Sequence, residues 1–431
     1  MTRSAEAALL LGAATIAAFG VALVNLARGD GIDAQVALTF VVMAASFGGF
    51  HIAVRQWSPD ASPYLLPLAA ILTAIGFVEV YRLNRALASL QRWWLLIATL
   101  LAVSLLLAVR RSGLAPLRRY RYVFLLAGLL LLLLPLLPAD WAFPLRGFEQ
   151  NGSRLWIRLE AGPLRLQFQP GEIAKLVLAT FLASYLSERQ AVLAAQTQPL
   201  GRYRLPELRQ LAPLVIAWAA SFVVLVYQRD LGASLLLFSL FIAMLYAATG
   251  RPVYLATGGF LFGAGAVATW MVFPHVQRRV SAWLDPFADF LDTGYQVAQS
   301  LFAFGSGSLS GSGLGLGSPD RIPNAPTDFI FAAVGEELGL AGSVAVIATY
   351  GLLVAVGFGI SLRSRDTFRK LLAGGLSFVL GLQTFLIIGG VTRLLPLTGI
   401  TLPFMSYGGS SLLANFLLLA LLARVSHEER T

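Results

Sequence analysis

The chain has 431 residues, of which 57% are hydrophobic and 13% charged, and its mean hydropathy is +0.74. Soluble domains carry about a quarter charged residues, so this composition indicates an integral membrane protein. The net charge of +10 fits basic loops beside anionic lipid better than nucleic-acid binding, and the absence of cysteine excludes disulfides and thiolate chemistry.

About twelve apolar segments are long enough to cross a bilayer, which takes about 20 mostly apolar residues. The first follows Arg3 as a signal peptide would, but its apolar run is long and no clear small-residue cleavage site follows, so we expect a helix. The sequence therefore predicts an all-α integral membrane protein with one membrane domain. The expected spans are residues 5–26, 35–55, 63–83, 92–110, 121–138, 172–187, 211–228, 232–249, 253–273, 328–356, 370–391 and 402–424.

Arginine placement predicts the orientation. The dense basic segments 110–121, 189–209 and 363–370 all face the cytoplasm if the N-terminus does, as the positive-inside rule requires. Three arginines between residues 82 and 92 fall on the other side and are the exception. This topology gathers four polar segments on the outer face: residues 139–171, 228–232, 274–327 and 392–399.

The longest polar segment, 274–327, is expected to be an outer loop, because loops of this length usually bind ligands or act as lids. Its Gly/Ser run 305–317 lacks the context of a phosphate-binding loop and predicts a flexible cover or a plain linker. The side chains of this loop expected to fold over a functional site beside Asp328 are Asp285, Asp289, Asp292, Tyr295 and Gln296.

Asp328 follows this loop at the start of an apolar segment. One interpretation is an N-cap of the next helix; the other is an ionisable group that works at the mouth of the bundle. From spacing alone the N-cap is favoured. Glu336 and Glu337, two turns further on, are expected to pair with an arginine and hold helices together.

Lys175 is one of only two lysines and lies one turn into an apolar segment. We expect it to pair with Asp230, while Glu172 starts the same helix, where the dipole favours an acid. Gly408 and Gly409 are expected to let helices pack closely, with direct substrate contact as the alternative.

Several longer motifs keep a common order along the chain. They are Leu155-Trp-Ile-Arg, Phe168-Gln-Pro-Gly-Glu-Ile-Ala-Lys175, Gln228-Arg-Asp-Leu-Gly-Ala-Ser234, Trp283-Leu-Asp-Pro, Gly294-Tyr-Gln-Val-Ala-Gln-Ser-Leu301, Thr327-Asp-Phe-Ile-Phe and Pro396-Leu-Thr-Gly-Ile-Thr-Leu-Pro-Phe-Met-Ser-Tyr-Gly-Gly-Ser-Ser411. Together they resemble the SEDS family (shape, elongation, division, sporulation), which includes RodA and FtsW.

This resemblance implies a ten-helix core in residues 63–431 and two extra transmembrane helices in residues 1–62. It also implies a multi-pass protein of the bacterial cytoplasmic membrane that polymerises lipid II into undecaprenyl-linked glycan, beside a class B penicillin-binding transpeptidase. Asp328 matches the family's essential acid. The chain departs from the family's common residues at Pro326, Gly171 and Ile387, none of which carries a charge that the chemistry uses.

On this basis we expect an inverting peptidoglycan glycosyltransferase in which Asp328 is the general base. Mg²⁺ or Mn²⁺ is compatible with the chemistry, although the sequence has no metal-ligand spacing. A flippase for a lipid-linked precursor and a non-enzymatic scaffold stay open, and both elongation and division roles fit. The residues expected to contact substrate are Arg154, Lys175, Arg229, Asp230, Tyr295, Gln296, Arg321, Arg393 and Ser406.

Overall fold

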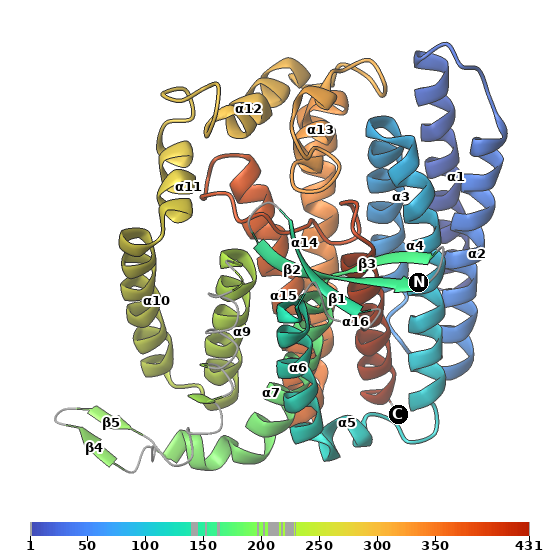
Figure 1. The fold of residues 1–431 in the computed structure, drawn as a ribbon. Coiled ribbons are helices and arrows are strands. Elements are labelled where there is room, and N and C mark those ends of the chain that lie inside the picture. Colours follow the sequence, from blue (N-terminus) through green and yellow to red (C-terminus); the bar gives the residue numbers. More distant parts are fainter. Residues whose placement is uncertain are drawn as a thin grey trace. The chain divides into compact units, whose positions relative to one another are not determined.

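The structure is a computed structural model, and it describes residues 2–138, 145–150, 153–161, 164–195, 198–200, 203–205, 215–216, 219, 228 and 230–430. These residues are mainly helical (Figure 1). Within them, nine helices are long and apolar enough to cross a membrane. They are α1 (Arg3–Ala27), α2 (Ala34–Trp57), α3 (Leu65–Leu83), α4 (Arg85–Val109), α9 (Leu231–Thr249), α10 (Pro252–Val272), α14 (Gly339–Arg363), α15 (Thr367–Val391) and α16 (Gly409–Glu428).

Shorter or more polar elements complete the described chain. The helices are α5 (Ala115–Arg119), α6 (Arg121–Leu133), η1 (Leu134–Leu136), α7 (Pro170–Ala195), α11 (Pro274–Leu284), α12 (Tyr295–Gly307), η2 (Pro319–Arg321) and α13 (Ile330–Glu337). The strands are β1 (Leu145–Gln150), β2 (Ser153–Ala161), β3 (Leu164–Phe168), β4 (Gln198–Leu200) and β5 (Tyr203–Leu205).

The predicted membrane-helical fold is confirmed, with local differences. The expected span 211–228 lies almost wholly outside the described residues. The expected loop 139–171 contains the antiparallel sheet β1-β2-β3, so the chain is not purely helical. The expected loop 274–327 contains α11, α12 and η2.

The expected helix 328–356 is broken into α13 and α14 at Gly339. This residue has φ +67°, and a Cβ there would lie 2.3 Å from the amide nitrogen of Gly311. The left-handed conformation and the close backbone approach both favour glycine, and they end the helix that apolar patterning alone predicts to continue.

The expected helix 402–424 begins later, at Gly409. Residues 402–408 form a turn in which Phe404 has φ +68°, and its backbone packs on α3. A Cβ at Gly76 of α3 would lie 2.3 Å from the Cα of Met405. Gly409 meets α4 in the same way, because a Cβ there would lie 2.1 Å from the Trp94 ring.

Side-chain caps fix several helix starts. Asp33 accepts from Gln35 at the start of α2 (3.0 Å), and Asn84 accepts from Ala86 and Leu87 at the start of α4 (3.0 and 3.1 Å). Such caps satisfy amides that have no partner inside the helix. Asn84 therefore separates α3 from α4 with no intervening loop.

The described chain forms two compact units. The first comprises residues 1–110, 265–356 and 380–431, and the second comprises residues 111–264 and 357–379. In the first unit α1 packs on α2 and α3, α2 and α16 pack on α4, and α12 packs on α13. In the second unit α7 packs between α6 and α9, and the three-stranded sheet contacts η1.

Candidate active site

Asp328 lies in a tight turn that precedes α13. Asn324 has φ +58°, and its carbonyl oxygen accepts the amides of Thr327 and Asp328, both at 3.1 Å. The residue at the N-cap position of α13 is Phe329, which makes no side-chain cap. The N-cap interpretation of Asp328 is therefore wrong, and its carboxylate is not engaged in starting the helix.

The turn is held by the segment that precedes α16. The amide of Tyr407 donates to the carbonyl oxygen of Pro326 at 2.8 Å. The hydroxyl of Ser406 donates to the carbonyl oxygen of Thr327 and accepts the amide of Leu402 at 2.9 Å. Ser406, a predicted substrate contact, thus holds Thr327, the residue before Asp328, and supports the turn.

Arg279 of α11 supplies the positive charge near Asp328. Its guanidinium donates to the carbonyl oxygens of Leu397 and Thr398 at 3.2 and 2.9 Å, which anchors the segment 394–407 to α11. Its charge also acts on the carboxylate of Asp328. The sequence analysis missed this residue, and the signal available was only a polar Gln277-Arg278-Arg279 run in an otherwise apolar stretch.

The environment raises the pKa of Asp328 from 3.8 to about 6. Burial is the main cause, because a half-buried carboxyl loses the water that stabilises its charge. A hydrogen bond from the Thr327 side chain and the charge of Arg279 oppose the shift only in part. A carboxylate of this kind is mostly ionised at neutral pH yet more basic than a free aspartate, which suits proton abstraction.

Arg393, a predicted anion contact, has carbonyl partners within the protein. Its guanidinium donates to the carbonyl oxygens of Trp283 and Leu284 at the end of α11, and the Trp283 indole donates back to the Arg393 carbonyl oxygen at 3.1 Å. A cation at a helix C-terminus satisfies carbonyls that lack intrahelical partners. Arg321 is exposed on η2.

The acids expected to fold over the site make contacts within their own turns. Asp285 accepts the amides of Phe287 and Ala288, and Asp289 accepts the hydroxyl of Thr293 at 2.7 Å, so both close their own exposed turns. Asp292 is exposed. Tyr295 and Gln296 begin α12, and the Tyr295 ring meets Phe290 edge-on, with ring centres 5.8 Å apart.

The second unit holds the other predicted contacts. Lys175 Nζ lies 3.0 Å from both carboxylate oxygens of Glu172, and both side chains are 7% exposed. Glu172 is therefore one partner of Lys175, and the expected pairing of Lys175 with Asp230 stays a prediction. Asp230 caps α9 through the amide of Ala233 at 2.9 Å. Arg154 is 47% exposed on β2, and Arg229 lies outside the described residues.

Comparison with known proteins places the chain in a family. A model of the FtsW/RodA/SpoVE cell cycle proteins matches residues 63–431. Peptidoglycan glycosyltransferase RodA of Mycobacterium bovis is 42% identical, covering 99% of this chain and 91% of its own. The RodA of Mycobacterium leprae is 39% identical with the same coverage, and a probable peptidoglycan glycosyltransferase FtsW of Geobacter metallireducens is 34% identical, covering 84% and 93%.

Two solved structures share the fold. One belongs to work on the structural coordination of polymerization and crosslinking by a peptidoglycan synthase complex, with a TM-score of 0.68 and 28% identity over 86% of this chain and 98% of the other. Rod shape determining protein RodA of Thermus thermophilus gives 0.58 and 26% over the same shares. With the family model matching more than half of it, this multi-pass bacterial membrane protein belongs to the FtsW/RodA/SpoVE family, the SEDS family that its motifs resemble.

Proposed function

We propose that this protein polymerises lipid II into glycan strands at the outer face of the cytoplasmic membrane, with Asp328 as its general base. It is a peptidoglycan glycosyltransferase, as its family is; the base, the stereochemistry and the side of the membrane are our proposals. The observation that supports Asp328 as the general base is the geometry of the 324–329 turn. It presents a half-buried carboxylate that caps no helix and lies beside the segment 394–407.

The reaction needs one proton acceptor and one leaving group. Asp328 takes the proton of the acceptor sugar's 4-hydroxyl, and that oxygen bonds to the anomeric carbon of the donor as the bond to the lipid pyrophosphate breaks. The electron pair leaves with the pyrophosphate. A single displacement inverts the anomeric centre, so an α-linked donor gives a β-linked glycan.

The leaving pyrophosphate requires positive charge. Arg279 is the cation that acts on Asp328, and we propose it as a ligand of the pyrophosphate. The phosphate ligands expected from the sequence, Arg154, Lys175, Arg229 and Arg321, stay predictions. Arg393 is a weaker candidate because its guanidinium already serves two carbonyl oxygens. Arginine binds phosphate oxygens through a two-pronged donor set, which suits this role.

A divalent cation would act on the same leaving group. In the described part of the chain no three acidic or histidine side chains converge as metal ligands. Mg²⁺ or Mn²⁺ would therefore take most of its ligands from pyrophosphate oxygens and water, as Mg²⁺ commonly does in phosphate chemistry. Its part would be to neutralise charge on the leaving group.

We further propose a class B penicillin-binding transpeptidase as partner. The support is the likeness to a chain from the peptidoglycan synthase complex whose printed description couples polymerization to crosslinking. A polymerase beside a transpeptidase delivers uncrosslinked glycan where crosslinks are made.

The test is glycan polymer formed from lipid II by the purified protein, with and without that transpeptidase. Asp328→Asn should lower the rate about a hundredfold or more, because Asn cannot accept the proton. Asp292→Asn, an exposed acid before α12, is the matched control and should retain activity. Normal polymer from Asp328→Asn would refute the base. Lipid II translocation without polymer by the wild type would favour a flippase, and neither activity would favour a scaffold.

A further inference from the structure

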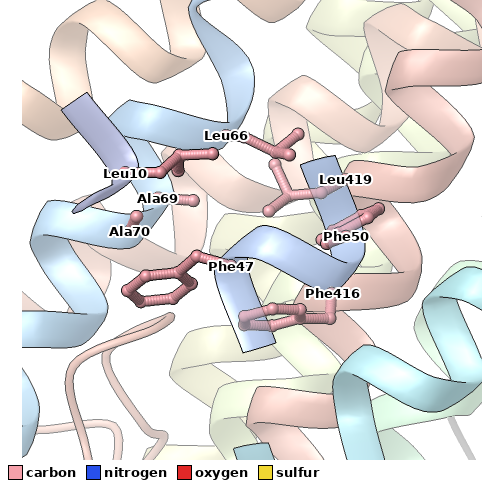
Figure 2. Close-up of a pocket in the computed structure, with 8 residues that line it drawn as sticks. All are labelled: Leu10, Phe47, Phe50, Leu66, Ala69, Ala70, Phe416 and Leu419. Carbon is pink, nitrogen blue, oxygen red and sulfur yellow. The ribbon is translucent and has the colours of Figure 1, made fainter. Parts of the chain in front are cut away.

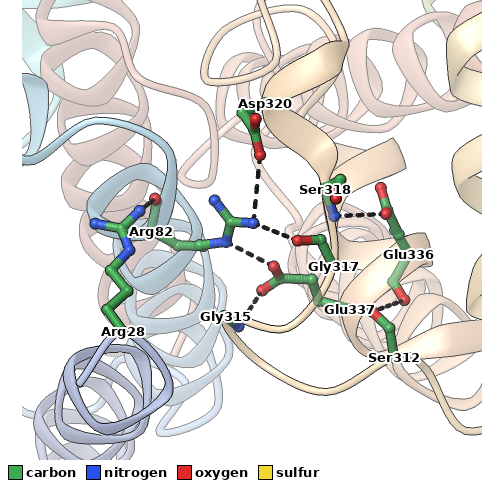
Figure 3. Close-up of polar contacts among 9 residues, drawn as sticks. All are labelled: Arg28, Arg82, Ser312, Gly315, Gly317, Ser318, Asp320, Glu336 and Glu337. Atoms are coloured by element: carbon green, nitrogen blue, oxygen red, sulfur yellow. Dashed lines mark hydrogen bonds and ion pairs between the residues drawn. The ribbon is translucent and has the colours of Figure 1, made fainter.

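Arg82, at the end of α3, joins two parts of the chain that are far apart in sequence (Figure 3). Its Nε donates to Oε1 of Glu337 at 2.7 Å, and its Nη2 donates to the carbonyl oxygen of Gly317 at 2.7 Å. The same nitrogen lies 3.5 Å from Asp320. The side chain of Arg82 is 7% exposed and that of Glu337 is fully buried, so this is a buried ion pair whose hydrogen bonds fix its geometry.

The Gly/Ser run is anchored to the same acids, contrary to its expected lack of anchors. Oε2 of Glu337 accepts the amide of Gly315 at 2.8 Å, and Oε1 of Glu336 accepts the amide of Ser318 at 2.7 Å. The carbonyl oxygen of Glu336 accepts both the amide and the hydroxyl of Ser312, at 2.9 and 3.0 Å. Together Arg82, Glu336, Glu337 and the run 312–318 form what we call the Arg82 network.

The Arg82 network is joined to Asp328 by a short rigid helix. Glu336 and Glu337 are the last two residues of α13, and Asp328 lies two residues before its start. Eight helical residues span about 12 Å, and every residue of α13 is buried. A shift at Glu337 therefore moves the turn that carries Asp328.

The end of α1 also holds this network. The side chain of Arg28 donates to the carbonyl oxygen of Arg82, one of the last carbonyls of α3 (Figure 3). The hydroxyl of Tyr81 donates to Asn25 Oδ1 at 2.9 Å, and Arg85 donates to the same oxygen at 3.1 Å. Residues on both sides of Arg82 are thus tied to α1.

The same end of α1 contacts the Gly/Ser run directly. Gly315 has φ +80°, and a Cβ there would lie 2.9 Å from the Cβ of Ala27 and 3.4 Å from the Cα of Val24. The helix therefore forms one wall of the run. Because Gly315 also donates to Glu337, α1 reaches the Arg82 network by two independent routes.

The α1–α2 hairpin is itself firmly seated on the core. Leu10 of α1 and Phe50 of α2 meet α3 and α16 in an apolar contact that leaves a cavity of only ≈ 10 Å³ (Figure 2). The ring of Phe50 stacks on that of Phe416 with centres 5.8 Å apart. A contact this well packed transmits displacement instead of absorbing it.

The hairpin precedes residue 63, where the family model begins, while the mycobacterial RodA relatives align with 99% of the chain. The FtsW of Geobacter metallireducens and the Thermus thermophilus RodA cover only 84% and 86% of it. The contact between α1 and the Arg82 network is therefore an addition to the core that the family model describes.

We propose that the α1–α2 hairpin positions Asp328, acting from Arg28 and Asn25 through the Arg82–Glu337 pair and α13. In this proposal Arg28, Asn25, Arg82 and Glu337 are positioning residues for glycan polymerisation that act through Asp328. This inference rests on the proposed function. It gives the two extra N-terminal helices a part in turnover and not only in membrane anchoring.

The experiment compares Arg28→Ala with Arg28→Lys in the full-length protein with lipid II as substrate. Arg28→Ala should lower kcat about fivefold, the factor for about 1 kcal/mol of lost hydrogen bonding, and leave KM unchanged. Arg28→Lys should restore most of kcat, since it can still donate to the Arg82 carbonyl. Arg55→Ala is the matched control, an exposed arginine at the other end of the hairpin, and should keep the wild-type kcat.

Hydrogen exchange gives a second readout that needs no activity. The amides of residues 312–318 should exchange faster in Arg28→Ala than in the wild type or Arg55→Ala, while α16 is unchanged. Wild-type kcat and unchanged exchange in Arg28→Ala would overturn the proposal. A wild type that makes no glycan would instead overturn the proposed function, and a rise in KM alone would assign Arg28 to substrate binding.

Discussion

The hydroxyl of Ser406 donates to the carbonyl oxygen of Thr327, the residue immediately before Asp328. Ser406 is 3% exposed and also accepts the amide of Leu402. Ser406→Ala removes both contacts and leaves a buried amide without its acceptor, at a cost of about 1–3 kcal/mol. We expect lower thermal stability and a fall in kcat that exceeds any change in KM. Ser310→Ala, at an exposed serine, is the control; equal behaviour of the two variants would contradict a supporting role for Ser406.

The raised pKa of Asp328 predicts a trade between stability and activity. Since the folded-state pKa of about 6 lies above the ordinary 3.8, the folded protein favours the protonated acid. The resulting loss in the free energy of unfolding is absent below pH 4, grows as the pH rises from 4 to 6, and is complete above pH 6. Its upper size is about 3 kcal/mol for a shift of this extent.

Asp328→Asn should therefore unfold at a higher temperature than the wild type at pH 7.5, although it is inactive. Below pH 4 the difference should vanish, because both side chains are then neutral. Thermal unfolding of the purified proteins from pH 3.5 to 8 measures it. A variant less stable than the wild type at pH 7.5 would show that the carboxylate is stabilised in the fold and not strained by burial.

The same pKa sets an acid limb on the rate. A base that must be ionised is half active at its pKa, so log(kcat/KM) for polymerisation should fall with unit slope below about pH 6. Asp292→Asn should show the same limb. A rate that is flat from pH 5 to 8 would exclude Asp328 as the group that titrates.

Local sequence signals located the helices and the functional turn, but not the partners of the charged groups. Apolar length predicts most spans, and the Thr327-Asp-Phe motif points to Asp328. Arg82 and Glu337 are 255 residues apart, and no periodicity in either helix can encode that pairing. The sequence also did not predict the ion pair that Lys175 forms with Glu172, one helical turn away.

The sequence also did not predict where backbone contacts interrupt the helices. The helix break at Gly339 comes from the close approach of this residue to Gly311, and the late start of α16 comes from the packing of Met405 on Gly76 of α3. Both depend on tertiary packing, which overrides local helix preference. The sheet β1-β2-β3 was missed because its strands are short and lie in a segment that composition marked only as polar.

The buried pair of Glu172 and Lys175 predicts strong coupling. Removing one partner breaks a buried ion pair in which both side chains are 7% exposed, which costs roughly 3–5 kcal/mol. Lys175→Met and Glu172→Gln should each lower the unfolding temperature more than the double variant does. The exposed pair of Arg158 and Glu160, 3.8 Å apart and 39% exposed, is the matched control and should couple by less than about 1 kcal/mol. Two equal coupling energies would show that burial does not govern the Lys175 pair.

Gly311 tests whether the Gly/Ser run is shaped by its contacts. It has φ +83°, and a Cβ there would lie 2.2 Å from the carbonyl oxygen of Glu337. Alanine is strained in the left-handed conformation, and its Cβ would displace backbone that the Arg82 network holds. Gly311→Ala should therefore lower the free energy of unfolding by about 1–3 kcal/mol or more. Gly305→Ala is the matched control. That residue lies inside α12 with nothing within 4 Å of an added Cβ, and alanine there should be neutral or stabilise by up to about 1 kcal/mol. If the run were a loose cover, Gly311→Ala would leave the unfolding temperature unchanged. We expect Gly311→Ala to lower both that temperature and kcat, because the displaced oxygen belongs to Glu337, which anchors α13.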